Sequence, residues 1–185
     1  MTLDATRTHF TVPPIDLKWK HAAELRQTQL TKPAGSLGQL ERLAIQLAGI
    51  QETPTPLVRP AHVLIFAADH PVVIHGVSAY PQEVTTAMVS NMLAGGAASS
   101  VLAKQFDIPM SIIDVGVKTP HPGMPQSPVV LHRSEAAAAG HAGDLSEAKA
   151  MDQGTFEAAL NAGADAVDRL DQCSLLIIGE LGIGN

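Results

Sequence analysis

The stretch Val63-Leu64-Ile65-Phe66-Ala67-Ala68-Asp69-His70 is a continuous apolar run that ends abruptly in an acid and a histidine. A polar loop follows, and then a segment of helical character, residues 82–93, which the pair Gly95-Gly96 stops. A buried strand that leads through a polar loop into a helix is the repeating unit of open α/β sheets. Such sheets bind ligands beyond the carboxyl ends of their strands. We therefore expect the polar residues after this strand to lie in a binding crevice.

The composition bounds the class of protein. With 185 residues the chain is long enough to bury a core, and 45% hydrophobic against 16% charged residues argues against disorder. Aromatic residues make up only 3%, which favours small side chains packed between helices and a sheet. The net charge of −6, without a cluster of Lys and Arg, argues against nucleic-acid binding. Because no signal peptide or membrane-spanning run is visible, we expect a soluble cytoplasmic protein with no membrane partner.

The first part of the chain predicts a small helical subdomain. Residues 1–15 show no periodicity and resemble an arm, whereas residues 16–30 are typical of a helix. After a turn at Pro33, Ser36 is placed to cap a second helix, with Gln39 completing a capping box. The apolar residues of this second helix recur at spacings of three and four: Leu40, Leu43, Leu47 and Ile50. This stripe packs either on its own domain or against another subunit.

The rest of the chain alternates strands with helices. Strands are expected at residues 61–68, 108–115, 129–131 (a short edge strand) and 174–178. Helices are expected at residues 81–93, starting at Pro81, at 97–106 and from about 152 to 170, and residues 136–143 are too rich in small side chains to assign. The fold class is α/β, a Rossmann-like three-layer arrangement of a parallel sheet with helices on both faces. We place an N-terminal arm and helical subdomain at residues 1–52 and a partial α/β substrate-binding domain at residues 53–185.

Three of the expected strands end with an acid beside or near a glycine: Asp69, Asp114 and Glu180. Because strands that alternate with helices are joined by right-handed crossovers, the sheet should be parallel and all three acids should lie along one edge. There they could hydrogen-bond ribose hydroxyls, stabilise positive charge at a reacting carbon, or bind a metal. In the simplest alternative, each acid only caps the helix that follows it.

Three further features each allow a structural and a functional interpretation. Asp69, His70 and His75 have the ligand types of a transition-metal site, but their spacing matches no metal motif, and we expect hydrogen-bonding groups and no metal. The glycines of residues 179–184 resemble a phosphate-binding loop, although their spacing is neither the dinucleotide fingerprint nor the Walker pattern. Cys173 is expected to be an inert packing residue.

Four blocks of sequence carry a resemblance to a known family. Residues 32–41 (KPAGSLGQLE) resemble its signature KPxGSLGxLE, and Asp69-His70 followed by residues 76–85 (GVSAYPQEVT) resembles its second block. Residues 91–98 (NMLAGGAA) and 179–185 (GELGIGN) resemble a third and a fourth. In this order the blocks are similar to the nicotinate-nucleotide–dimethylbenzimidazole phosphoribosyltransferases.

The resemblance implies a reaction. Members of this family transfer phosphoribose from nicotinate mononucleotide to 5,6-dimethylbenzimidazole, which releases nicotinate and yields α-ribazole 5′-phosphate for the lower ligand of cobalamin. The resemblance also implies a homodimer and no cofactor. Ribosyl transfer develops positive charge at the anomeric carbon, and a carboxylate should remove the proton from the incoming benzimidazole nitrogen.

The resemblance further implies roles for individual residues. Tyr80 and Met88 would line the base pocket together with Leu181. Glu180 would be the catalytic residue near the ribose and the reacting centre. The phosphate would be held by Gly182, Gly184 and Asn185. The other expected substrate-binding residues are Asp69, His70, Ser78, Pro81, Asn91 and Asp114.

The chain departs from the family pattern in two ways. Pro71 and His75 stand where the family more often has a glycine and an acid, which changes a backbone donor and the charge at the crevice lip. Family members also continue past residues 182–185, and their glutamate general base lies in that further part. We therefore expect an amino-terminal half that is inactive alone. The alternatives are a shortened, non-catalytic nucleotide- or benzimidazole-binding or regulatory module, and an enzyme that acts on another azole base.

Overall fold

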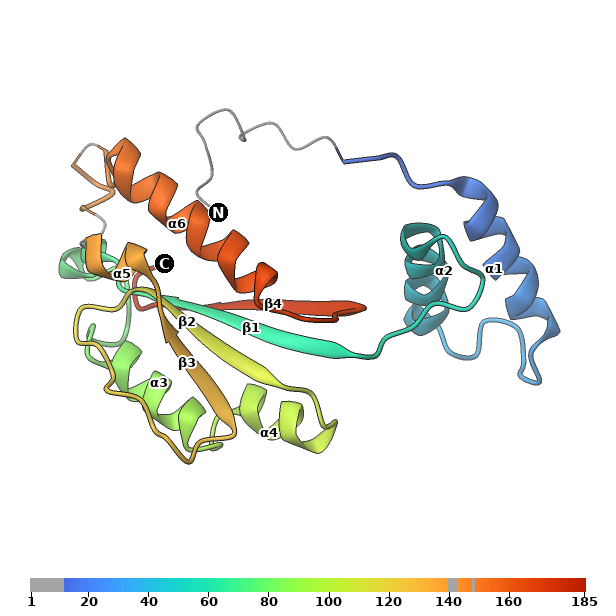
Figure 1. Cartoon of the computed structure of the whole chain (residues 1–185), viewed down its shortest axis with the longest axis horizontal. Coiled ribbons are helices and arrows are strands. Elements are labelled where there is room, and N and C mark those ends of the chain that lie inside the picture. The colour runs from blue at the N-terminus through green and yellow to red at the C-terminus, as the bar shows by residue number, and fades with distance from the viewer. Residues whose placement is uncertain (1–11, 140–142, 148) are drawn as a thin grey trace. The chain divides into compact units, whose positions relative to one another are not determined.

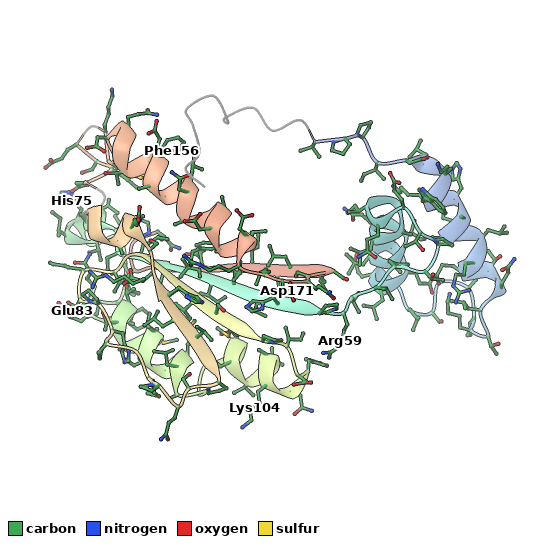
Figure 2. All side chains as sticks on the ribbon, viewed as in Figure 1. Arg59, His75, Glu83, Lys104, Phe156 and Asp171 are labelled. Carbon is green, nitrogen blue, oxygen red and sulfur yellow. The ribbon has the colours of Figure 1, made fainter. Side chains whose placement is uncertain are left out.

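The computed structural model describes residues 12–139, 143–147 and 149–185, which form two compact units. The helical unit ends at Val58 and the sheet unit begins at Arg59, whereas the sequence analysis places the boundary after residue 52. The linker stays with the helices because Gln51 bonds both backbone groups of Leu57: its Nε2 donates to the carbonyl oxygen, and its Oε1 accepts from the N–H, each at 2.8 Å. Arg59, labelled in Figure 2, donates instead to the carbonyl oxygens of Asp107 and Phe106 in the sheet unit.

The helical unit contains α1 (Leu17–Gln29) and α2 (Gln39–Gln51). Asp16 caps α1 by accepting a hydrogen bond from the Lys18 N–H at 2.9 Å, so the first expected helix is confirmed. None of the helices in the described ranges is long and apolar enough to cross a membrane.

The capping box expected at Ser36 is wrong. The N-cap of α2 is Gly38, which has no side chain to donate or accept. Glu41, in the first turn of α2, fulfils this role instead, because its Oε1 accepts from the Leu37 N–H at 3.1 Å and from Lys32 Nζ at 2.7 Å. The turn before α2 is therefore closed by an acid inside the helix.

The sheet unit is built on four parallel strands (Figure 1). They are β1 (Ala61–Ala68), β2 (Met110–Gly116), β3 (Val129–Arg133) and β4 (Leu175–Leu181), in the order β3-β2-β1-β4. The parallel pairing and the edge position of β3 confirm the fold class. β1 therefore lies at the centre, with β2 on one side and β4 on the other.

Helices cover both faces of this sheet (Figure 1). On one face α3 (Val84–Leu93) and α4 (Ala98–Gln105) pack over an apolar layer that includes Ile65, Leu93 and Ile112. On the other face α5 (Glu135–Ala139) and α6 (Gln153–Asp168) lie over a smaller layer that includes Leu64 and Ile113. Alternate residues of β1 and β2 thus face opposite layers, as the period of two in a strand requires.

Two local features differ from expectation. The helix expected from Pro81 begins at Val84, because the N–H groups of Val84 and Thr85 donate to the carbonyls three residues earlier and form a tight turn. Residues 71–75 form a 3₁₀ helix, η2 (Pro71–His75), for which the loop composition provided no signal. Pro71 is tolerated there because the first residue of a helix needs no N–H partner.

Two histidines are half-buried on the sheet. His62 Nε2 lies 3.0 Å from Ser111 Oγ, and His132 lies on β3. Burial lowers the pKa of His62, with a further contribution from His132. Burial also lowers the pKa of His132, with a further contribution from Arg169. Both imidazoles are therefore held in the neutral form.

This arrangement makes the fold sensitive to mild acid. Below about pH 6.5 the unfolded chain protonates these histidines more readily than the folded chain does, so the stability present above that pH is lost as the pH falls. We expect the Tm from calorimetry to decrease between about pH 7.5 and about pH 5.5, by roughly 2–4 °C for each kcal/mol lost. A His62→Asn, His132→Asn double variant should show a smaller decrease, and an equal decrease would contradict this explanation.

Candidate functional site

The carboxyl ends of the strands bring the three acids to one edge of the sheet. Asp114 pairs in register with Ala67 of β1, Glu180 pairs with Phe66, and Asp69 follows β1 directly. The acids are therefore neighbours although they are far apart in the sequence.

Neither of the two buried acids at this edge caps a helix. Asp69 Oδ2 accepts from the Lys118 N–H at 2.8 Å. Asp114 Oδ1 accepts from the N–H groups of Gly116 at 3.0 Å and Val117 at 2.8 Å. Both carboxylates thus hold the loop that follows β2. Their structural role is to fix this loop, whereas the sequence suggested that they cap helices.

The glycine loop after β4 packs closely against the end of β1. A methyl carbon at Gly182 would overlap the carbonyl oxygen of Ala68 and approach the His70 ring to 3.0 Å. Gly184 has φ +92°, and a methyl carbon there would lie 3.0 Å from the His70 carbonyl oxygen. Glycine is required at both positions, at Gly182 for space and at Gly184 also for its backbone conformation.

Thr85 ties this loop to α3. Its side chain is fully buried, and its Oγ1 accepts a hydrogen bond from the Ile183 N–H at 3.1 Å across 98 residues of sequence. Sequence reasoning quoted Thr85 in a motif without giving it a role. A polar residue at the start of an apolar helix is the signal in the sequence that would have indicated it.

An open crevice of about 440 Å³ lies beside the glycine loop. Ser78, on the loop before α3, lines it, and Ser78 Oγ accepts from the Tyr80 N–H at 3.2 Å. The other lining residues are Val72, Val77, Leu145, Gly182, Ile183, Gly184 and Asn185. Four of the expected site residues, namely Ser78, Gly182, Gly184 and Asn185, thus surround one space.

Other expected site residues do not line this crevice. Met88 and Leu181 are partly buried and pack against the same apolar layer under α3. Tyr80 is 64% exposed, and Pro81 and Asn91 are also exposed. Asp69 and His70 line a second cavity, on the α6 side of the sheet. The expected residues therefore divide between the two faces of the sheet.

Glu180, the expected catalytic residue, is exposed on the edge strand β4. Its Oε2 accepts a hydrogen bond from Asn185 Nδ2. Because Asn185 lines the crevice, this bond links the carboxylate of Glu180 to the glycine loop.

Sequence reasoning missed a polar group at the end of η2. His75, labelled in Figure 2, has its Nε2 2.6 Å from Asp144 Oδ2 and 3.0 Å from Ser146 Oγ. The pKa of Asp144 is lowered, mainly by the N–H and hydroxyl of Ser146 and less by His75. Both partners meet the same imidazole nitrogen, so the group lacks the relay through opposite nitrogens that nucleophilic triads use. Asp144 lies 69 residues from His75, and no local pattern announced their contact.

The described residues contain no group of three or more His, Cys, Asp and Glu side chains placed to hold a metal ion. Within them His75 is engaged by an acid and a hydroxyl on the protein, and Asp69 by a backbone amide.

The close approach at Gly182 leads to a stability prediction. A Gly182→Ala variant must move a backbone carbonyl, and overpacking of this kind costs about 1–3 kcal/mol, which urea unfolding would detect. Gly163→Ala is the matched control, because nothing lies within 4 Å of a methyl carbon in the middle of α6. We expect that control to stabilise by roughly 0.5–1 kcal/mol. Equal effects of the two substitutions would contradict the packing described here.

Comparisons with known proteins agree with this architecture. A family model described as "Phosphoribosyltransferase" matches residues 12–185. The nicotinate-nucleotide–dimethylbenzimidazole phosphoribosyltransferase of Pseudomonas syringae pv. syringae is 49% identical over 174 residues, which cover 92% of this chain and 47% of that protein. The protein of the same name from Ectopseudomonas mendocina is 44% identical, over 93% of this chain and 48% of its own.

A solved structure has the same fold. The crystal structure of CobT from Thermus thermophilus superimposes with a TM-score of 0.76 at 39% identity, over 91% of this chain and 49% of that one. This chain spans about half the length of the curated relatives that it matches. On the family match and the identity to these relatives, the chain belongs to the phosphoribosyltransferase family.

Proposed function

We propose that this chain forms the amino-terminal half of a phosphoribosyltransferase site that takes nicotinate mononucleotide and 5,6-dimethylbenzimidazole. These are the substrates that the names of its relatives contain. In the reaction, a nitrogen of the benzimidazole attacks the anomeric carbon, the bond from that carbon to nicotinate breaks, and the other benzimidazole nitrogen loses its proton to a carboxylate. The products are nicotinate and α-ribazole 5′-phosphate.

The crevice beside the glycine loop supports the proposal most strongly. Residues 182–185 follow a parallel strand, and Gly182 and Gly184 hold their backbone against β1. The Asn185 side chain supplies an amide donor next to them. Backbone and side-chain amides at the carboxyl edge of a sheet are suited to bind a phosphate. A hydrogen bond from an N–H group to a charged oxygen is stronger than one between two neutral groups. We assign this crevice to the phosphoribose.

Glu180 and the α3 face complete the proposed site. Glu180 is hydrogen-bonded to Asn185 and would stabilise positive charge at the anomeric carbon if the phosphate lies on the same loop. Met88 and Leu181 both pack against the apolar layer under α3. This position favours binding of the apolar benzimidazole on that face of the sheet. Tyr80, Pro81 and Asn91 would border this base. Asp114, whose Oδ1 is occupied by two amides, acts in this proposal as a positioning residue.

We further propose that the 185-residue chain binds substrate without turnover. About half the length of the relatives has no counterpart in these residues, and Glu180 is exposed rather than enclosed in a catalytic pocket. The chain would therefore bind nicotinate mononucleotide without catalysing the transfer of phosphoribose. In the alternative, a non-catalytic binding module, the same crevice would serve for recognition only.

Calorimetric titration tests the phosphate assignment. We expect nicotinate mononucleotide to bind, and an Asn185→Ala variant to bind it roughly 10- to 100-fold more weakly, because a hydrogen bond to a charged group contributes about 1.5–3 kcal/mol. Nicotinate riboside, which has no phosphate, is the control ligand, and its affinity should not change in the variant. An equal loss of affinity for both ligands would contradict the assignment of the phosphate to this loop.

Nicotinate release in the presence of 5,6-dimethylbenzimidazole would show turnover and contradict the proposed inactivity of the chain.

The helical unit favours association with a second copy, which we propose as a homodimer. Leu40, Leu43 and Ile50 of α2 are 63%, 53% and 55% exposed, so the apolar stripe is not covered by α1. Uncovered apolar stripes of this kind are typical of subunit contacts.

Sedimentation measurements test this contact. A Leu43→Glu variant should shift the chain from dimer to monomer, because a carboxylate cannot be buried unpaired in an apolar interface. Leu57→Glu, at another exposed leucine of the same unit, should leave the dimer intact. A wild-type chain that is monomeric at high concentration would exclude the proposed dimer.

A further inference from the structure

The second cavity lies on the opposite face of the sheet from the proposed base pocket. We call it the α6 cavity; it has a volume of about 300 Å³. Its walls come from the ends of β1 and β2, from η2, α5 and α6, and from the segment before α6, and they include Val115, Thr155 and Ala159. Val115 belongs to the apolar layer under α6, whereas Met88 packs in the layer under α3. A ligand in the α6 cavity would therefore not contact the residues proposed for the benzimidazole.

The lining of the α6 cavity is almost entirely apolar. Val115, Leu145, Met151 and Ala159 are among the side chains that face it. Among the described residues that line it, Asp69 is the only acidic one, and it is 3% exposed. A single carboxylate provides too few oxygen ligands for a divalent cation, and it would repel a phosphate. The chemistry of the walls instead suits a flat apolar molecule.

Asp69 has an oxygen available for such a molecule. Its Oδ2 accepts from the Lys118 N–H, but its Oδ1 is buried and has no hydrogen-bond donor among the described residues. The N–H of Thr155, which also lines the cavity, does not supply one, because it donates to Asp152 Oδ1 at 2.7 Å. Buried polar atoms nearly always have a partner, so an orphaned carboxylate oxygen at an apolar cavity points to a missing donor.

We propose that the α6 cavity is a second small-molecule site, for a planar heteroaromatic molecule that donates one N–H group to Asp69 Oδ1. The volume lies at the lower end of the range for small-molecule pockets, which fits a molecule of one or two fused rings. The apolar walls would hold the ring faces, and the unpartnered Asp69 Oδ1 would orient the N–H. The inference does not rest on the proposed transferase function, because Asp69, Met151 and Ala159 do not line the crevice assigned to the phosphoribose, although the two spaces share Val72 and Leu145.

Methyl NMR can locate the ligand, because the chain has methionines on both faces of the sheet. We would label the six methionines with ¹³C at the methyl carbon and assign Met151 and Met88 with Met→Leu variants. Indole is the probe, and benzothiophene, which has the same shape but no N–H, is the control. We expect indole to shift the Met151 methyl signal saturably while Met88 stays unchanged, and benzothiophene to bind roughly tenfold or more weakly. Equal affinities, or a shift confined to Met88, would overturn the proposal.

Two substitutions sharpen the test. Ala159→Leu fills the cavity and should abolish the Met151 shift, whereas Ala164→Leu, on α6 but outside the cavity lining, should preserve it. Asp69→Asn should weaken indole roughly tenfold and leave benzothiophene unchanged, so the acceptor role is tested even if the filled variant does not fold. Indole binding that survives Ala159→Leu, or an equal loss of both probes in Asp69→Asn, would overturn the proposal. Titration of the wild-type chain with nicotinate mononucleotide separates the two proposals. If nicotinate mononucleotide does not bind, the proposed function is contradicted, while the Met151 response to indole should still be observed.

Discussion

The position of β1 between two parallel neighbours is the constraint on which the rest of the site depends. β1 pairs with β2 on one side and β4 on the other, so three carboxyl ends meet at one edge. A parallel sheet needs a crossover between each pair of strands, and these crossovers cover both faces with helices. This one arrangement positions the glycine loop, the buried acids, the crevice beside the glycine loop and the α6 cavity.

Close backbone packing then divides the edge into two sides. Gly182 lies against the carbonyl of Ala68, and Thr85 holds the Ile183 N–H from the α3 side. Asp69 holds the loop after β2 and faces the α6 side. The end of β1 thus separates two spaces: an open crevice of mixed polar and apolar lining next to the glycine loop, and a smaller, mainly apolar cavity under α6. The two spaces share Val72 and Leu145 in their walls but differ in chemistry.

Local patterns predicted the elements well where one physical rule dominated. The apolar run of residues 61–68 and the edge strand near Val129 were identified because burial and alternation leave a direct trace in sequence. The same rules failed where a side chain competed with a motif. Glu41 replaced Ser36 as the group that closes the turn before α2, and Gln51 kept the linker in the helical unit. In both cases a long side chain bonds a backbone group four or six residues away, which short-range motifs do not predict.

The sequence by itself determined the α/β class, the parallel order of strands and helices, the glycine loop after the last strand and the resemblance to the transferase family. These properties depend on local periodicity and on contiguous motifs, which a single chain displays. Only the tertiary structure decided which candidate residues meet. It separated Asp69 and His70 from Met88 and Leu181, joined His75 to Asp144, and left Asp69 Oδ1 beside an apolar cavity. Such contacts join residues tens of positions apart, and their geometry is set by how helices pack on the two faces of the sheet, which no local pattern encodes.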